Sequence, residues 1–128
     1  MVTYLLDTAP LLWAVAEPGK LSRTVRKLIE SRNHRLFVSV ASLWEVVLKA
    51  QKGLLDLEDP PSWLEAGIRS IEAEVLPIKA AHVYAVGQLP AIHKDPFDRI
   101  LLAQAASEGC TLISNDRLVR QYPVPAIW

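Results

Sequence analysis

The chain has 128 residues, and 51% of them are hydrophobic, which suits one domain with a substantial core. Its 14 lysine and arginine residues balance 14 aspartate and glutamate residues, so it lacks the overall positive charge that drives non-specific nucleic-acid binding. A single cysteine, Cys110, excludes an intrachain disulfide. No apolar run is long enough to cross a bilayer, and the N-terminus lacks the positive region of a signal peptide. We therefore expect a cytoplasmic protein without membrane contact.

The first half of the chain alternates short apolar runs with amphipathic stretches. Ser or Thr before a helix and Gly or Pro after it mark the boundaries. In chain order we predict a strand at 2–6, a helix that Thr8 caps and that stops at 17–19, a helix capped by Ser22, a strand at 36–40, a helix from Ser42 to about Lys52, and a helix at 63–74 capped by Ser62.

The second half continues the alternation. We predict a strand at 75–78, a helix at 80–89, a long apolar helix that opens at Asp95-Pro96 and stops at Gly109, a strand at 111–113, a short helix at 117–122 and an edge strand in the last residues. Strands that alternate with helices indicate a parallel sheet covered by helices on both faces. We expect residues 1–128 to form one α/β domain.

Four acidic residues stand where an apolar run ends and the next segment begins: Asp7, Glu45, Asp98 and Asp116. Because the carboxyl ends of parallel strands meet at one edge of a sheet, these residues can lie close together. Crowded carboxylates repel one another unless a cation lies among them, and hard divalent cations prefer oxygen ligands. The pattern therefore predicts a Mg²⁺ or Mn²⁺ site.

Each acid taken singly also has a structural explanation. Ser42 and Glu45 have the spacing of a capping box, and Asp98 lies near the positive end of its helix dipole. However, Asp98 also heads the apolar stripe of its own helix, which continues with Leu101 and Leu102. A charge facing that way is costly without a partner, and a shared cation would be such a partner.

Other side chains near these acids are candidates for support or for substrate binding. Ser114, Ser42 and Thr8 could donate to a ligand carboxylate, although helix capping explains Ser42 and Thr8 equally well. Asp95 could act beside Asp98, but helix capping is the favoured explanation for Asp95. His93 lies in the loop before Asp98 and could contact a substrate. An anionic substrate would be held locally by cations, for which the candidates are Lys49, Lys52, Lys94, Arg99, Arg117 and Arg120.

Four phrases of the sequence resemble one family. LLDTAPLLW, ASLWEVVLK, DPFDRILLAQA and LISNDRLVRQY are similar to the PIN-domain ribonucleases, and specifically to the VapC-type toxins of bacterial type II toxin–antitoxin systems. The resemblance covers nearly the whole chain, and the third phrase is its most specific part.

The resemblance implies a parallel sheet of order 3-2-1-4-5 flanked by helices on both faces, homodimers, cleavage of RNA to 5′-phosphate and 3′-hydroxyl ends, and a cognate antitoxin that covers the active site. Carried over, the family's catalytic and metal-binding acids fall on Asp7, Glu45, Asp98 and Asp116, and Ser114 matches its small hydroxyl residue. One departure is Ala9, where close relatives often have His.

Two alternative hypotheses about the function are left open by the sequence. A response-regulator receiver domain is also a small α/β protein with an acidic Mg²⁺ pocket, but it normally has adjacent acids after its first strand, and Asp7 stands alone. A catalytically silent binding module would keep the fold without the reaction.

Overall fold

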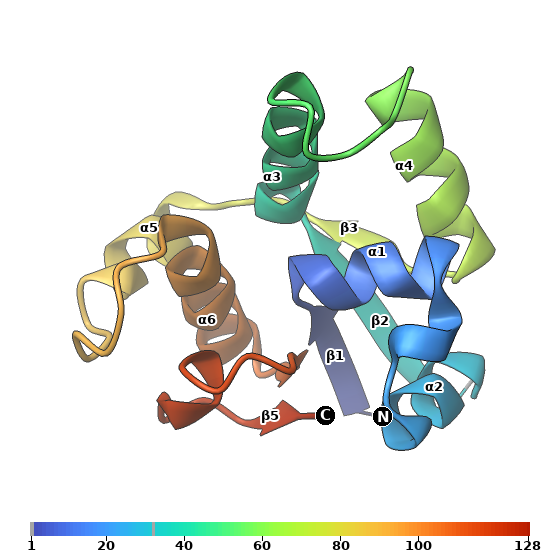
Figure 1. Ribbon diagram of the computed structural model, residues 1–128. Coiled ribbons are helices and arrows are strands. Elements are labelled where there is room, and N and C mark those ends of the chain that lie inside the picture. The colour runs from blue at the N-terminus through green and yellow to red at the C-terminus, as the bar shows by residue number, and fades with distance from the viewer. Residues whose placement is uncertain (1, 32) are drawn as a thin grey trace.

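The computed structural model describes residues 2–31 and 33–128. Within them, the strands form one sheet in which every pairing is parallel and the order is β3-β2-β1-β4-β5 (Figure 1). This confirms the predicted order. The strands are β1 (Val2–Leu6), β2 (His34–Ser39), β3 (Glu74–Leu76), β4 (Thr111–Ile113) and β5 (Ala126–Ile127).

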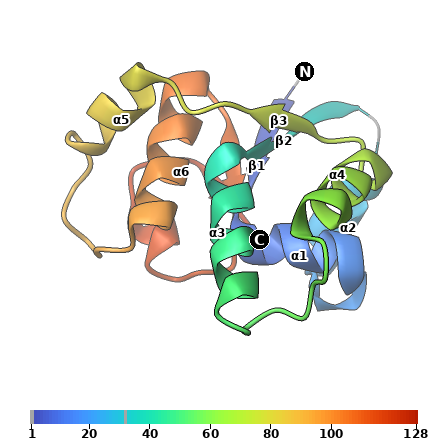
Figure 2. The same cartoon turned by 90° about the horizontal axis from the view of Figure 1, so that it is seen from above.

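Helices cover both faces of the sheet (Figures 1 and 2). On one face lie α1 (Thr8–Ala16), α2 (Arg23–Glu30) and α4 (Pro60–Ser70), and on the other lie α5 (Ala80–Val86) and α6 (Pro96–Glu108). Helix α3 (Val40–Gln51) follows β2 directly and stands over the carboxyl edge of the sheet. Two short 3-10 turns, η1 (Pro18–Lys20) and η2 (Val119–Gln121), complete the elements. No helix among the described residues is both long and apolar enough to span a bilayer.

The sheet separates two apolar clusters. Leu5 and Leu112 pack with α6 on one face, whereas Leu6 and Ile113 pack with α1, α2 and α4 on the other. Successive residues of a strand point to opposite faces, so a strand buried on both sides must be apolar throughout. This is why the carboxyl-terminal halves of β1 and β4, Leu5–Leu6 and Leu112–Ile113, are apolar and buried, and it leaves the positions just after them as the place for polar side chains.

The strand order excludes the hypothesis that the chain is a response-regulator receiver domain. Receiver domains have the doubly wound order 2-1-3-4-5, whereas here β1 lies between β2 and β4. The two orders place different strand ends next to one another, so the acidic pocket of a receiver domain cannot be built on this sheet.

Several helix boundaries differ from those predicted. Ser39, not Ser42, caps α3, and its Oγ accepts the backbone N–H of Ala41 at 3.0 Å. Asp59, not Ser62, caps α4, whose first residues are Pro60 and Pro61. Proline is tolerated in a first helical turn because the N–H groups there have no intrahelical acceptor. Pro60 and Pro61 therefore begin helix α4, three residues before the predicted start at Trp63.

The other differences shorten elements. Helix α4 ends at Ser70, so Glu74 begins β3 instead of ending the helix. Helix α5 ends at Val86, and the predicted helix at 117–122 is reduced to the 3-10 turn η2. Strand β3 stops before Pro77, which has no N–H to donate to a neighbouring strand.

Candidate active site at the carboxyl edge of the sheet

Asp7 stands at the centre of this edge, between the end of β1 and the start of α1. Its backbone N–H donates to the carbonyl of Ile113 at 2.9 Å, so the β1–β4 pairing fixes its position. Its Oδ1 accepts the N–H of Thr8 and its Oδ2 accepts the hydroxyl of Ser114, both at 2.8 Å. Asp7 itself therefore caps α1 and Thr8 is the first helical residue, which corrects the prediction that Thr8 is the cap.

Ser114 connects Asp7 to Asp116. The Ser114 hydroxyl donates to Asp7 and accepts the backbone N–H of Asp116 at 3.1 Å. The Oδ1 of Asp116 in turn accepts the N–H of Leu118 at 2.8 Å. Ser114 is fully buried, so this bridge has little freedom and holds the two acids side by side.

Glu45 enters the site from α3. Its carboxylate is paired with Lys49, one turn further along the same helix, at 3.2 Å, and the Glu45 side chain is only 15% exposed. Ser42, also on α3, is buried and accepts the hydroxyl of Thr8 at 3.0 Å. Ser42 therefore joins α3 to α1 and does not take part in the predicted capping box with Glu45.

Asp98 lies in the first turn of α6. Asp95 caps this helix as predicted, and its Oδ1 accepts the N–H groups of Phe97 and Asp98 at 2.9 and 3.1 Å. The Oδ2 of Asp98 is 3.0 Å from Nε2 of His93, and the Asp98 side chain is 16% exposed. Asp95 thus fixes the helix start that presents Asp98.

The four acids influence one another electrostatically. Burial raises the pKa of Asp7 despite the hydrogen bonds from Ser114 and Thr8, and the charges of Glu45 and Asp116 raise it further. The pKa of Asp98 is raised to about 6, chiefly by burial and further by the charges of Asp7 and Asp95, against the hydrogen bond from His93. Asp7 is thus linked electrostatically to Glu45, Asp98 and Asp116.

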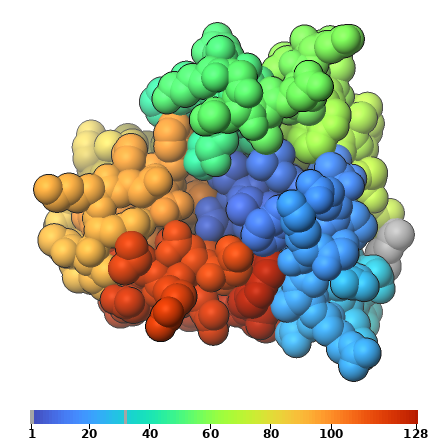
Figure 3. All heavy atoms as spheres, viewed as in Figure 1, coloured from blue at the N-terminus to red at the C-terminus, as the bar shows by residue number. Residues whose placement is uncertain are grey.

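On the surface, the segments that carry the four acids lie next to one another. In Figure 3, the dark blue atoms at the start of α1 are surrounded by green atoms of α3, orange atoms of α6 and red atoms of the C-terminal segment. A hollow of about 300 Å³ continues from Glu45 between α3 and the start of α6, lined also by Lys49, Lys52, Asp95 and Phe97.

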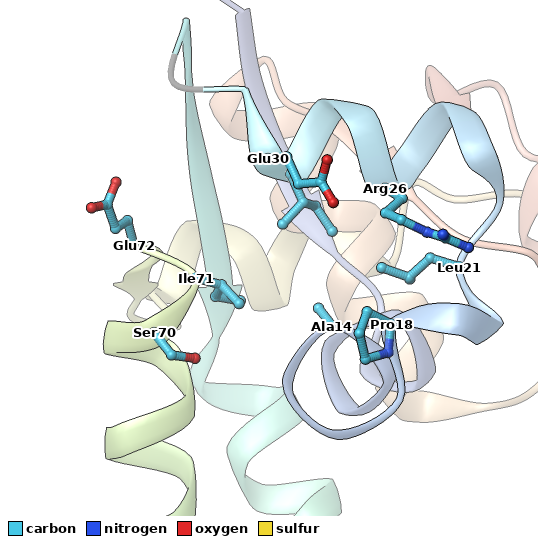
Figure 4. Close-up of a pocket in the computed structure, with 9 residues that line it drawn as sticks. Ala14, Pro18, Leu21, Arg26, Glu30, Ser70, Ile71 and Glu72 are labelled. Carbon is cyan, nitrogen blue, oxygen red and sulfur yellow. The ribbon is translucent and has the colours of Figure 1, made fainter.

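A second hollow of about 280 Å³ lies elsewhere, between α1, α2 and α4 (Figure 4). Arg26 and Glu30 of α2 line it, and Leu21 and Ile71 contribute apolar surface. It contains none of the predicted site residues, so the two hollows are separate features.

The donor chemistry of the edge suits a hard cation. All four candidate ligands are carboxylates, which Mg²⁺ and Mn²⁺ prefer. Burial, with a further contribution from neighbouring carboxylates, raises the pKa of Asp7 and Asp98, and a bound cation would oppose this rise because it favours the ionised form. Within residues 2–31 and 33–128, however, no three acidic, histidine or cysteine side chains are already arranged to hold an ion. The acids therefore lie near one another without forming a ready-made ion site among the described residues.

Comparison with known proteins decides the family. The sequence model of the PIN domain matches residues 4–124. The chain belongs to the PIN-domain family. Ribonuclease VapC22 of Mycobacterium tuberculosis is 30% identical over 137 residues, which cover 98% of this chain and 95% of that protein. The resemblance to VapC-type PIN domains predicted from the four phrases is thus confirmed.

Solved structures show the same PIN fold. VapBC2 from Rickettsia felis, bound to a DNA fragment from its promoter, has a TM-score of 0.79 at 18% identity and covers 99% of both chains. VapBC-5 from Mycobacterium tuberculosis, described as a member of the VapBC family of toxin–antitoxin systems, has a TM-score of 0.60 at 15% identity over 99% of this chain and 97% of that one.

The predicted RNA-binding cations of this PIN domain differ in availability. Lys49 and Lys52 line the hollow beside Glu45, and Lys94 and Arg117 are exposed on the other side of the site. Arg99 is different, because its guanidinium donates to the carbonyls of Pro90 and Val86 and to the Tyr122 hydroxyl. It is occupied in holding the loop before α6, and we leave it out of the proposed substrate-binding set.

Sequence reasoning missed part of the PIN-domain site. His93 was predicted only as a possible substrate contact, yet it is bonded to Asp98, and Tyr122 is bonded to His93 at 2.7 Å. The position of His93 five residues before Asp98 was a usable signal. Nothing in the local sequence marks Tyr122, which is 29 residues away from His93.

Proposed function

We propose that the chain is a single PIN domain that acts as a Mg²⁺- or Mn²⁺-dependent endoribonuclease, the toxin of a toxin–antitoxin pair. The observation that carries this proposal is that carboxylates from separate parts of the chain lie near one another at one sheet edge, where the charges of Glu45 and Asp116 help raise the pKa of Asp7 and the charge of Asp7 helps raise that of Asp98. The curated relative that is named a ribonuclease supports the reaction type.

In this proposal Asp7 and Asp98 bind the ion directly, and Glu45 and Asp116 complete its surroundings. When bound, the ion would supply activation of water and neutralisation of charge at the phosphodiester. The contribution of the chain's own residues is to hold the acidic side chains in position. Ser114 holds Asp7 through Oδ2, and the caps at Asp7 and Asp95 fix the starts of α1 and α6.

The substrate would be gripped by local cations because the chain has no net charge. Lys49 and Lys52 lie along the hollow that leads from Glu45, and Lys94 and Arg117 are exposed near Asp98 and Asp116. These residues would contact phosphates, which gives affinity without base specificity. The preference for RNA over DNA rests on the curated relative.

We also propose a protein partner. The similar solved structures are described as VapBC assemblies, one of them from a toxin–antitoxin family. By analogy, this chain would form a homodimer, act on RNA in the cytoplasm, and be neutralised by a cognate antitoxin that covers the carboxylate edge. Co-expression with the product of a neighbouring reading frame would test this, with co-purification as the readout.

The test of the reaction uses Asp7→Asn. We expect purified parent protein to cleave fluorescent RNA with Mg²⁺ or Mn²⁺ and to be inactive in EDTA. Asp7→Asn should lose cleavage while keeping its circular dichroism spectrum, because the amide cannot neutralise a cation. Asp56→Asn, at an exposed position in the loop before α4, is the matched control and should cleave like the parent. An active Asp7→Asn variant would contradict the proposal.

A catalytically silent binding module is the second candidate. It is favoured by the finding that no three potential ligands among the described residues are arranged to hold an ion. If the parent cleaves no RNA with either metal, and neither Mg²⁺ nor Mn²⁺ raises its melting temperature, this candidate replaces the nuclease.

A further inference from the structure

His93 connects the Asp98 carboxylate to a buried anchor. Its Nε2 is 3.0 Å from Asp98 Oδ2, and its Nδ1 is 2.7 Å from the hydroxyl of Tyr122. The two aromatic rings meet edge to face at 5.4 Å between centroids. The imidazole is 12% exposed, and Tyr122 is 4% exposed. His93 is therefore held at both ring nitrogens.

Counting donors and acceptors sets the direction of these bonds. The Tyr122 hydroxyl accepts Nη1–H of Arg99 at 3.0 Å and the backbone N–H of His93 at 3.1 Å. These two donors use its two lone pairs. The hydroxyl's own hydrogen then goes to Nδ1 of His93, the nearest acceptor. In a neutral imidazole the proton must consequently lie on Nε2, and Nε2–H donates to Asp98.

If the imidazole were charged, the bond from His93 Nε2–H to Asp98 would be unchanged, because Nε2 carries a hydrogen in both forms. Asp98 Oδ2 is the acceptor in either case. This bond engages one carboxylate oxygen, and no described residue donates a hydrogen bond to the other, Oδ1. The arrangement fixes the Asp98 rotamer and leaves Oδ1 for another ligand.

Arg99 completes the anchor from the residue next to Asp98. Its guanidinium donates to the carbonyls of Val86 and Pro90 and lies 5.9 Å from the centre of the Tyr122 ring. Tyr122 belongs to the segment between η2 and β5, so the anchor ties the loop before α6 to the C-terminal part of the sheet. A rigid support of this kind is what a metal-binding carboxylate requires.

We propose that His93 is a positioning residue of the nuclease site, which holds Asp98 through Oδ2, is itself fixed by Tyr122 and Arg99, and keeps Oδ1 available for a divalent ion. This inference rests on the proposed function, since it takes Asp98 as a ligand. It adds a role for residues outside the four acids. His93 acts through Asp98 and need not touch the substrate.

The experiment measures Mn²⁺ binding to the purified protein by calorimetry, alongside kcat and KM for RNA cleavage. We expect His93→Ala to lower the Mn²⁺ affinity by about 10-fold or more, as is usual when a group supporting a metal ligand is lost. His93→Gln, whose amide can place an N–H near the former Nε2, should keep most of the affinity. The KM for RNA should stay at the parental value.

Tyr122→Phe separates positioning from general stability. Removing the hydroxyl frees the imidazole without removing the ring, so we expect a smaller loss of Mn²⁺ affinity. In a His93→Ala background the same change should have no further effect on binding, because Tyr122 acts through His93. His34→Gln is the matched control: His34 begins β2 at the opposite end of the sheet, and its variant should bind Mn²⁺ like the parent.

The outcomes distinguish the two levels of the proposal. If Asp98→Asn binds Mn²⁺ as tightly as the parent, Asp98 is not a ligand and the proposed function itself fails. If Asp98→Asn loses binding but folded His93→Ala binds like the parent, only the role of His93 is overturned. Should His93→Ala not fold, Tyr122→Phe decides, and parental Mn²⁺ affinity in that variant overturns the inference.

Discussion

Replacing Asp98 with Asn should stabilise the metal-free protein, although it removes a proposed functional group. The carboxylate of Asp98 is mostly buried, with 16% of its side chain exposed. Its pKa is raised from 3.8 to about 6, chiefly by burial and also by the charge of Asp7, against the opposing hydrogen bond from His93. Asn has nearly the same shape and can still meet His93, so the substitution mainly removes the buried charge.

The pKa gives the size of the effect and its pH window. A rise from 3.8 to about 6 amounts to about 2 units, each of which corresponds to about 1.4 kcal/mol. The native state binds the Asp98 proton more tightly than the unfolded state, so the parent loses stability as pH rises from about 4 to about 6. Above that window the loss is complete, at most about 3 kcal/mol, and Asp98→Asn avoids it.

The assay is thermal unfolding in EDTA at several pH values. At pH 7.5 Asp98→Asn should melt up to roughly 10 °C higher than the parent, since about 1 kcal/mol shifts a domain of this size by about 4 °C. Near pH 4 the two melting temperatures should converge. Asp56→Asn, at an exposed position, should follow the parent throughout.

Two results would refute this reasoning. One is an Asp98→Asn variant that melts below the parent at pH 7.5 in EDTA, which would mean that the ionised carboxylate contributes stability. The other is a difference that does not depend on pH. In a separate measurement, added Mn²⁺ should raise the melting temperature of the parent and of Asp56→Asn but not that of Asp98→Asn, because an ion that binds only the native state stabilises it by mass action.

Two further predictions concern the support of the site and the packing of the helices. Ser114→Ala removes the donor to Asp7 Oδ2 and should lower the free energy of unfolding in urea by about 1–3 kcal/mol. Because the lost bond lowers the pKa of Asp7, the acidic limb of the pH profile of RNA cleavage should move to higher pH. An unchanged acidic limb would count against this prediction. Gly67→Ala places a Cβ 2.7 Å from a Val15 side-chain methyl and should lower stability by about 1–3 kcal/mol, whereas Gly19→Ala, which meets nothing within 4 Å, should not.

The strands were predictable because their burial demands a simple pattern. β1 and β4 end in apolar pairs that are covered on both faces, Leu5–Leu6 and Leu112–Ile113, and these pairs are followed at once by Asp7 and Ser114. Helix α6 was predictable for a similar reason, since its cap Asp95 and its terminating Gly109, which has a φ of 68°, both have strong local preferences.

The helix caps at α3 and α4 were misread because several residues competed for one role. Ser39 and Ser42 are both suitable caps, and the choice depends on where β2 stops, which its pairing with β1 and β3 decides. Ser62 was predicted as the cap of α4 instead of Asp59 because two consecutive prolines, Pro60 and Pro61, are also typical of a loop. For both helices the local sequence offered two possible cap residues, and the packing of the folded chain selected one of them.

The sequence by itself determined the alternation of strands and helices and the four acids that end or follow them, because these depend on burial and on local backbone preferences. Only the tertiary structure decided which side chains hold those acids. Ser114 reaches Asp7 across 107 positions of the chain, and Tyr122 reaches His93 across 29. Such partners have no local signature, because the order of the strands in the sheet, rather than their spacing in the chain, brings the donors and acceptors within hydrogen-bonding distance.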